Sequence, residues 1–100
     1  MSGWELANAI VARDRSRALS AARKLVEAGE EPIRIVGGIA WQARKMLASR
    51  TTQHYELNEL LAFPAHLLEA DRALKSRQIS ASSVLESLVD RIVGTGGGGA

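Results

Sequence analysis

The sequence predicts an all-α fold, a compact bundle of about five helices, and three observations support this class. Along most of the chain, apolar residues recur at the three- and four-residue spacing of one helix face. Hydrophobic residues make up 46% of the 100 residues, and only two residues are proline. Glycine falls at the ends of the periodic segments, except at Gly37 and Gly38. We expect one domain over residues 1–93 and a flexible glycine-rich tail over residues 94–100, since a chain of this length can bury a single core.

Two helices are predicted before residue 29. Ser2 and Glu5 have the spacing of a capping box at the start of the first helix. Its apolar face, which runs to about residue 12, consists of Leu6, Ala9 and Ile10, with Trp4 as a further candidate. Asp14 is suited to cap the second helix, and Gly29 can adopt the left-handed conformation that ends it. The apolar face of this second helix consists of Ala18, Leu19, Ala22, Leu25 and Val26.

A third helix is predicted to begin at Glu31-Pro32, because proline at the first helical position loses no hydrogen bond. Residues 33–41 are apolar almost all round, so we expect other helices to surround this segment at the centre of the bundle. A strand over residues 33–36 would have no neighbouring strand with which to pair. Gly37 and Gly38 each cost about 1 kcal/mol relative to alanine, which predicts close approach of another backbone or a kink. Residues 42–50 are amphipathic, with Ala43, Met46 and Leu47 inward and Arg44, Lys45 and Arg50 outward.

The fourth helical region is interrupted in the prediction. Residues 51–56 form a polar connection, and residues 57–63 form a short helical turn that Pro64 interrupts or kinks. Residues 65–77 are helical, and Asp71 and Lys75 have the favourable order for an ion pair one turn apart. The residues expected near its inward side are Leu67, Leu68, Ala70 and Leu74.

The last helix is predicted to begin at Ser80 or Ser82, and Ser83 with Glu86 has the spacing of a second capping box. Its apolar face consists of Leu85, Leu88, Val89 and Ile92, whereas Glu86, Asp90 and Arg91 face outward.

The net charge of +2 is distributed unevenly between the two halves of the chain. Residues 1–50 contain nine Lys and Arg against five Asp and Glu, whereas residues 51–100 contain four against six. A basic half can attract phosphate groups, which would suit a nucleic-acid partner. We favour the alternative, a solvated helix end and face that consists of Arg13, Arg15, Arg17, Arg23 and Lys24.

No catalytic, cofactor or metal site is predicted. The chain has no cysteine and no glycine-rich phosphate-binding motif. His54 and His66 are separated by twelve positions and a proline, and surface or partly packed roles suit them better than a metal pair. The positive end of a helix dipole accounts for the acidic pair Glu30/Glu31. A solvated helix face accounts for Glu69/Asp71, and helix capping accounts for Ser80, Ser82 and Ser83.

Trp4 and Trp41 could stack on nucleic-acid bases. We favour core packing for Trp41, because it adjoins the most apolar segment. A cytoplasmic location is expected, since no signal segment and no apolar run of membrane-spanning length occur in the sequence.

Six short motifs occur in order along the chain: Leu-Ala-Asn-Ala-Ile at 6–10, Arg-Ala-Leu at 17–19, Leu-Val-Glu-Ala-Gly-Glu-Glu-Pro-Ile at 25–33, Trp-Gln-Ala-Arg-Lys-Met-Leu at 41–47, Leu-Glu-Ala-Asp-Arg-Ala-Leu-Lys-Ser at 68–76 and Val-Leu-Glu-Ser-Leu-Val at 84–89. Their order and spacing resemble the C-terminal helical domain of the delta subunit of the bacterial DNA polymerase III clamp loader. The stretch between Arg50 and Pro64 is shorter than the family's usual link, and Arg77 stands where a glycine often ends the helix.

The resemblance implies a non-catalytic domain that packs beside the C-terminal domains of the gamma/tau and delta-prime subunits in a circular collar. It also implies two preceding AAA+-like domains, the first of which contacts the sliding clamp, so we expect no clamp contact from this chain. ATP would be hydrolysed in gamma/tau. The competing hypotheses are a free-standing helical DNA-binding module and an adaptor unrelated to replication; direct DNA binding is expected to be weak or absent.

Surplus apolar surface marks a contact site, and we expect it mainly on the third and last helices. The predicted interface is therefore the outward side of the last helix with the latter part of the third. The residues predicted at its rim are Arg44, Lys45, Glu86, Asp90 and Arg91.

Overall fold

The computed structural model describes residues 3–49 and 53–94, and over these ranges the chain forms five α-helices and no strand. The helices are α1 (Gly3–Val11), α2 (Arg15–Glu27), α3 (Pro32–Ser49), α4 (Leu57–Ser76) and α5 (Ala81–Val93). The predicted all-α fold is confirmed. Within the described ranges, none of the helices combines the length and apolar character needed to cross a membrane. Predictions for Ser2, Arg50, Thr51, Thr52 and residues 95–100 lie outside the described residues.

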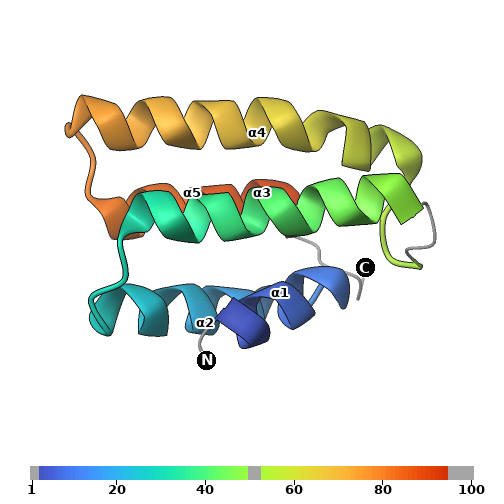
Figure 1. Cartoon of the computed structure of the whole chain (residues 1–100), viewed down its shortest axis with the longest axis horizontal. Coiled ribbons are helices and arrows are strands. Elements are labelled where there is room, and N and C mark those ends of the chain that lie inside the picture. Colours follow the sequence, from blue (N-terminus) through green and yellow to red (C-terminus); the bar gives the residue numbers. More distant parts are fainter. Residues whose placement is uncertain (1–2, 50–52, 95–100) are drawn as a thin grey trace.

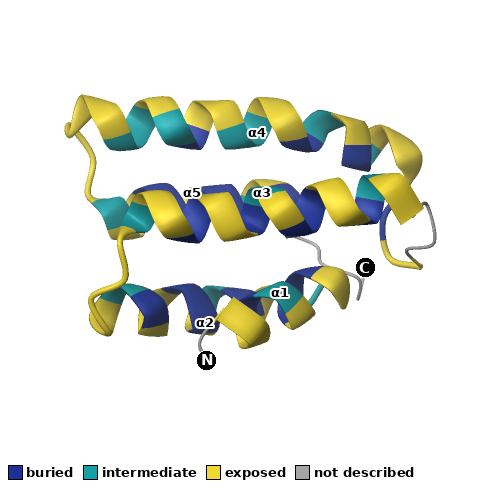
Figure 2. Ribbon diagram, in the orientation of Figure 1, coloured by how far each residue is buried: buried dark blue, intermediate teal, exposed yellow. Residues whose placement is uncertain are grey.

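The helices pack at three levels (Figure 1). α3 and α5 occupy the middle, α4 lies against both of them on one side, and α1 and α2 lie on the other side. In Figure 2 the buried turns of each helix face its neighbours, whereas the exposed turns lie on the outside of the bundle. Two antiparallel pairs, α1 with α2 and α3 with α4 (Figure 1), both contact the last helix.

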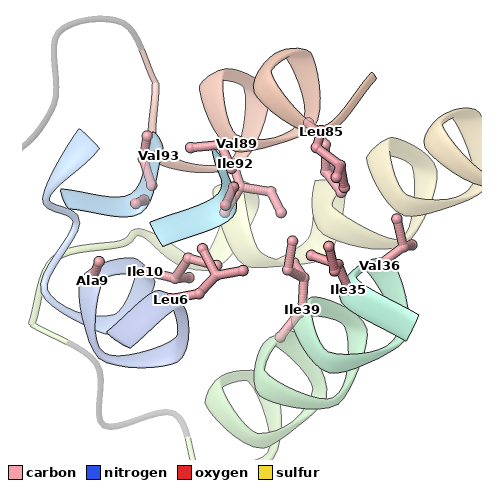
Figure 3. Packing of buried hydrophobic residues seen from close by; sticks show 14 of the residues in the cluster. Leu6, Ala9, Ile10, Ile35, Val36, Ile39, Leu85, Val89, Ile92 and Val93 are labelled. Atoms are coloured by element: carbon pink, nitrogen blue, oxygen red, sulfur yellow. The ribbon is translucent and has the colours of Figure 1, made fainter. Parts of the chain in front are cut away.

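The core forms where α1, α3 and α5 meet (Figure 3). Short aliphatic side chains from the three helices point toward one another there, and those labelled in the figure are Leu6, Ala9, Ile10, Ile35, Val36, Ile39, Leu85, Val89, Ile92 and Val93. α5 is the most completely buried of the three, since its core residues are Val84, Leu85, Leu88, Val89, Ile92 and Val93. The predicted apolar face of the last helix is confirmed.

The prediction that residues 33–41 form the centre of the bundle is wrong in part. Ile35, Val36 and Ile39 are buried, but Ile33 is 47% exposed and Trp41 is 54% exposed. Successive residues of an α-helix turn by about 100°, so a single side of α3 meets the other helices and the opposite side faces outward. A segment that is apolar all round does not specify which side that is.

Local signals position the turns between the first three helices as predicted. The carboxylate of Asp14 caps α2 by accepting a hydrogen bond from the backbone N–H of Arg17 at 3.1 Å. Gly29 adopts a φ of +90° directly after α2, and the N–H groups of Gly29 and Glu30 reach back to the carbonyls of Val26 and Leu25. This double return is a Schellman motif, which satisfies the last carbonyls of the helix.

The junction between α1 and α2 has the same double return, but without a glycine. The N–H groups of Arg13 and Asp14 bond the carbonyls of Ile10 and Ala9 at 3.0 and 2.8 Å. Arg13 occupies the left-handed position with a φ of 56°. A side chain at this position costs roughly 1 kcal/mol relative to glycine, so its retention calls for compensating contacts.

α4 is one continuous helix, so the predicted interruption at Pro64 is wrong. Proline in a helix interior removes one hydrogen bond and costs about 3 kcal/mol. Burial on both sides of the proline, by Leu60 and Phe63 before it and by Ala70 after it, offsets this cost. Leu68, predicted on the inward side, is 52% exposed.

The structure tests two further predictions, the ion pair near the end of α4 and the cap at the start of α5. The predicted ion pair between Asp71 and Lys75 is confirmed, with Nζ and Oδ2 at 3.0 Å. α5 begins after Ser80, whose Oγ accepts a hydrogen bond from the N–H of Ser83 at 3.2 Å. Ser80 is thus the cap, as one of the two predicted starts, and the capping box predicted at Ser83 is wrong.

Replacing Arg77 with glycine is expected to raise the free energy of unfolding by about 0.5–1 kcal/mol. Arg77 follows α4 in the left-handed conformation with a φ of 60° and a ψ of 18°, and it is exposed. Glycine adopts this conformation without the steric penalty. Urea unfolding followed by circular dichroism measures the gain, and Arg72→Gly inside α4 is the matched control, expected to lose about 1 kcal/mol. A loss for Arg77→Gly would contradict the left-handed assignment.

Candidate interaction surface

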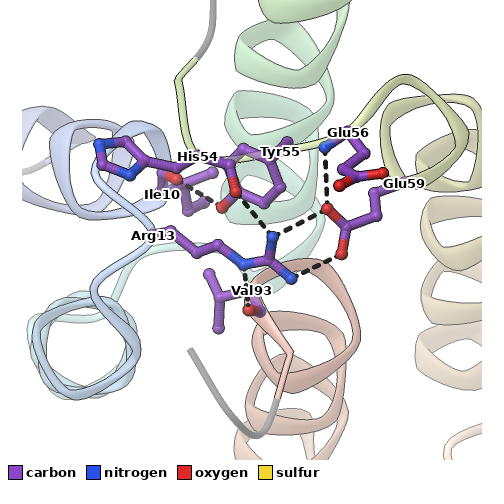
Figure 4. Close-up of polar contacts among 7 residues, drawn as sticks. All are labelled: Ile10, Arg13, His54, Tyr55, Glu56, Glu59 and Val93. Carbon is purple, nitrogen blue, oxygen red and sulfur yellow. Dashed lines mark hydrogen bonds and ion pairs between the residues drawn. The ribbon is translucent and has the colours of Figure 1, made fainter. Parts of the chain in front are cut away.

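Arg13 is the central polar residue of the fold and joins three parts of the chain (Figure 4). Its Nη1 and Nη2 donate to Oε1 and Oε2 of Glu59 at 2.8 and 2.7 Å, a two-point contact with α4. Its Nε donates to the carbonyl of Val93 at 2.8 Å, and Nη1 also donates to the carbonyl of His54 at 2.7 Å. These contacts compensate for its left-handed backbone. The side chain is only 16% exposed, so its predicted place on a solvated face is wrong.

Tyr55 also belongs to the Arg13 cluster, although it lies in the segment before α4 that was predicted to be a polar connection. Its hydroxyl donates to the carbonyl of Ile10 at 2.5 Å, and its ring lies beneath the guanidinium of Arg13, 4.7 Å from the carbon Cζ. Tyr55 also meets Phe63 edge to face at 5.4 Å. Burial raises the pKa of the Tyr55 hydroxyl. The hydrogen bonds from Arg13 lower the pKa of Glu59, with a further contribution from the N–H of Glu56.

Ion pairs across the bundle account for the uneven charge of the two halves. Arg15 of α2 contacts Asp90 of α5 at 2.6 Å, and Arg23 contacts Glu86 at 3.0 Å. With Arg13 and Glu59, three arginines of the basic half therefore meet three carboxylates of the acidic half. Basic and acidic segments attract each other within the fold, so the surplus of positive charge in residues 1–50 is partly neutralised before any partner binds.

The predicted rim residues fall into two groups. Glu86 and Asp90 pair with α2, and Arg91 pairs with Glu69 of α4, so these charges have partners within the chain. Arg44 and Lys45 are exposed on α3, and the ammonium of Lys45 lies 4.5 Å from the centre of the Trp41 ring. Their role at an interface stays a prediction.

His54 contributes its backbone carbonyl to the Arg13 cluster, whereas His66 lies on α4. The pKa of His66 is lowered, first by burial and then by the charge of Arg91. In the ranges that the structure describes, no three His, Asp or Glu side chains come together in a group suited to a metal ion.

Exposed large apolar side chains lie on α1, α3 and α4 and in the turn before α5, and none of those in the described residues lies on α5 itself. They are Trp4, Val11, Ile33, Trp41, Leu57, Leu61, Leu68 and Ile79. Surplus apolar surface was expected on the third and last helices, and the expectation for the last helix is wrong because the bundle covers its entire apolar face. Trp4, which was a candidate for the buried face of α1, is 73% exposed.

A groove with a volume of about 650 Å³ lies between α1 and α3. Both exposed tryptophans line it, Trp4 from α1 and Trp41 from α3. Its other lining residues include Leu6, Ala7, Asn8, Ile10 and Val11 of α1, Arg34, Ile35, Gly38, Ile39, Gln42 and Lys45 of α3, and Leu25 and Glu30 of the α2 region. The predicted core position of Trp41 is wrong: its ring forms part of a groove wall. The apolar content of residues 33–41 indicated burial, but it did not indicate which of these residues lie on the outward side of α3.

Gly37 and Gly38 do not lie against another backbone, so that part of the prediction is wrong. A Cβ atom added at either position would meet no atom within 4 Å in the described structure. Both glycines face outward on α3, and Gly38 lies in the groove. The cost of two glycines in a helix therefore has no compensation from packing inside the chain.

A comparison of the sequence with protein-family models identifies the family of this chain. The family described as DNA polymerase III delta subunit, C-terminal domain, matches residues 2–54, just over half of the chain. The matched residues include α1, α2 and α3, and hence both walls of the groove. Comparisons with curated proteins and with solved structures gave no significant match. The chain belongs to the family formed by the C-terminal domains of DNA polymerase III delta subunits, which serve the clamp loader in DNA replication.

Proposed function

We propose that this domain is a non-catalytic assembly domain, which packs beside the C-terminal domains of the gamma/tau and delta-prime subunits in the collar of the clamp loader. The observation that carries the proposal is the exposure of both Trp4 and Trp41 at one groove between α1 and α3. Tryptophan is enriched at the energetic centres of protein interfaces. Membership of the delta family supports a place in the same assembly.

The outward side of α5 with the latter part of α3 is proposed as a second part of the collar interface, with Arg44, Lys45, Glu86, Asp90 and Arg91 at its rim. Charges at a rim influence the association rate and the choice of partner more than the affinity. The ion pairs of Glu86, Asp90 and Arg91 would also fix their side chains before a partner arrives.

The alternative, a DNA-binding module that uses the basic N-terminal half, has less support. A recognition helix needs several basic or amide side chains on one exposed face. On α2, Arg15 and Arg23 already contact carboxylates of α5, and Arg13 contacts Glu59. The phosphate contacts available to this half are correspondingly fewer.

Size-exclusion chromatography with the purified gamma/tau and delta-prime C-terminal domains tests the proposal. The chain is expected to elute in a joint peak with at least one of them, and sedimentation velocity gives the stoichiometry. Gel shifts with duplex DNA over a range of salt concentrations provide the comparison. Separate elution, or sub-micromolar DNA binding with a steep salt dependence, would contradict the collar assignment.

A further inference from the structure

The groove between α1 and α3 has a shape suited to bind one helix. On α3, Arg34, Gly38, Trp41 and Lys45 follow one another at spacings of four, three and four residues. This spacing places them in one row along the helix. At 1.5 Å per residue the row extends roughly 16 Å, the length of about three helical turns. Trp4, Ala7 and Val11 of α1 form the facing wall, also at helical spacing.

Gly38 marks the point in this row where another backbone can approach. It lies between the two cations and next to Trp41, and nothing within 4 Å would meet a side chain there. Small residues at helix contacts allow close approach of the backbones, and a flanking tryptophan supplies the apolar area. Gly37 is its neighbour in sequence but does not line the groove. Gly37 and Gly38 are thus the same residue type at adjacent positions, and only Gly38 lines the groove.

The charges of the groove indicate an acidic occupant. Arg34 and Lys45 stand at the two ends of the row, and Glu30 is the one carboxylate among the described lining residues. Arg34 forms no ion pair with any described residue, and the ammonium of Lys45 lies over the Trp41 ring. Two cations offset by one carboxylate are too few to hold a nucleic acid, whose affinity rises with the number of phosphates neutralised. They suit a protein helix with a carboxylate near each end.

We infer that this groove binds an amphipathic α-helix of a neighbouring clamp-loader C-terminal domain, with its small or apolar residues against Gly38 and between Trp4 and Trp41, and with carboxylates beside Arg34 and Lys45. The inference rests on the proposed function and assigns to it a particular surface. It keeps Lys45 from the proposed rim, adds Arg34, and gives these two cations rather than the charges of α5 direct contacts with the partner.

Two glycine variants test whether the groove binds a helix, and both leave the bundle intact. Gly38→Leu fills the groove, whereas Gly37→Leu places the same side chain outside it. Both replacements improve helix propensity, so both should raise the melting temperature of the free chain. Gly38→Leu is expected to weaken binding of the gamma/tau or delta-prime domain at least about tenfold, because the partner backbone is held off. Gly37→Leu should bind within about twofold of the unchanged chain.

A charge pair of variants tests the acidic occupant. The double variant Arg34→Glu, Lys45→Glu should weaken the complex at least about tenfold, since both carboxylates of the partner would face like charge. The double variant Arg17→Glu, Lys24→Glu changes net charge equally on exposed positions of α2 outside the groove and should bind as before.

The chain's two tryptophans give a direct readout, because both line the groove. Incorporation of 5-fluorotryptophan into this chain alone lets fluorine NMR follow Trp4 and Trp41 during titration with an unlabelled partner. Both resonances are expected to shift upon binding, and neither should shift upon addition of single-stranded DNA.

The outcomes separate this inference from the proposed function. If the unchanged chain forms no complex, both fail. If it forms a complex that Gly38→Leu does not weaken and the fluorine resonances stay in place, the collar assignment survives and the groove inference is wrong. Shifts caused by DNA, or by self-association of the chain alone in sedimentation, would assign the groove to another occupant and also overturn the inference.

Discussion

Arg13→Ala is expected to lower the free energy of unfolding by about 2–3 kcal/mol. The replacement removes the two-point contact with Glu59 and the hydrogen bonds to the carbonyls of Val93 and His54. It also removes the cation above the Tyr55 ring. Glu59 then keeps its charge without its main partner, and the junction of α1 and α2 loses its connection to α4 and α5. Urea unfolding followed by circular dichroism measures the loss.

Two other variants separate the stability contributed by the Arg13 side chain from the cost of its left-handed backbone. Arg15→Ala removes an exposed ion pair with Asp90 and is expected to cost less than about 1 kcal/mol. Arg13→Gly should lose about 1 kcal/mol less than Arg13→Ala, because glycine adopts the left-handed backbone without strain. Equal losses for Arg13→Ala and Arg15→Ala would contradict the central position of Arg13.

The pH dependence supplies a second measurement of the same contact. Glu59 has a lowered pKa in the folded chain, chiefly through hydrogen bonds from Arg13. A lowered folded pKa stabilises the fold above the ordinary carboxyl pKa, and this stability is lost as the pH falls through the folded value. Stability should therefore decline less steeply below about pH 4.5 in Arg13→Ala than in the unchanged chain.

Features that depend on neighbouring residues could be predicted from the sequence. Asp14 and Ser80 cap helices through N–H groups three residues away, and Gly29 ends α2 through its own backbone freedom. The apolar face of α5 was evident because charges occupy the opposite side. In each case the deciding interaction lies within one helical turn, where sequence spacing fixes the geometry.

Features that depend on distant residues could not be predicted. Arg13 and Glu59 are separated by 46 positions, and nothing near Arg13 distinguishes it from the exposed Arg15 and Arg17. Tyr55 lies in a polar connection, and its burial depends on Ile10, 45 positions away.

The groove was missed for a related reason. Residues 33–41 of α3 contain both an inward apolar side and an outward one, and apolar content alone does not separate a core from a contact surface. Trp41 and Gly38 were assigned to the interior because the bundle was assumed to supply their only partners. Once the fold gives their direction, the same residues line an open groove between α1 and α3, where we infer that a second chain binds.

Phe63→Ala is expected to lower the free energy of unfolding by about 3–5 kcal/mol, a larger loss than for Arg13→Ala. Phe63 is 2% exposed and is among the largest fully buried side chains in the described core. It meets Tyr55 edge to face, so its removal also loosens the ring that bonds the carbonyl of Ile10. Thermal and urea unfolding measure the loss.

Leu61→Ala is the matched control for this replacement, because Leu61 lies two residues earlier on α4 and is 60% exposed. It is expected to change stability by less than about 0.5 kcal/mol, since little apolar area is uncovered and alanine favours a helix. The contrast follows from α4 continuing through Pro64 with Leu60, Phe63 and Ala70 on one buried side. If Pro64 instead broke the helix, residues 57–63 would pack independently of the rest, and Phe63→Ala would resemble the control because a short detached turn contributes little to global stability.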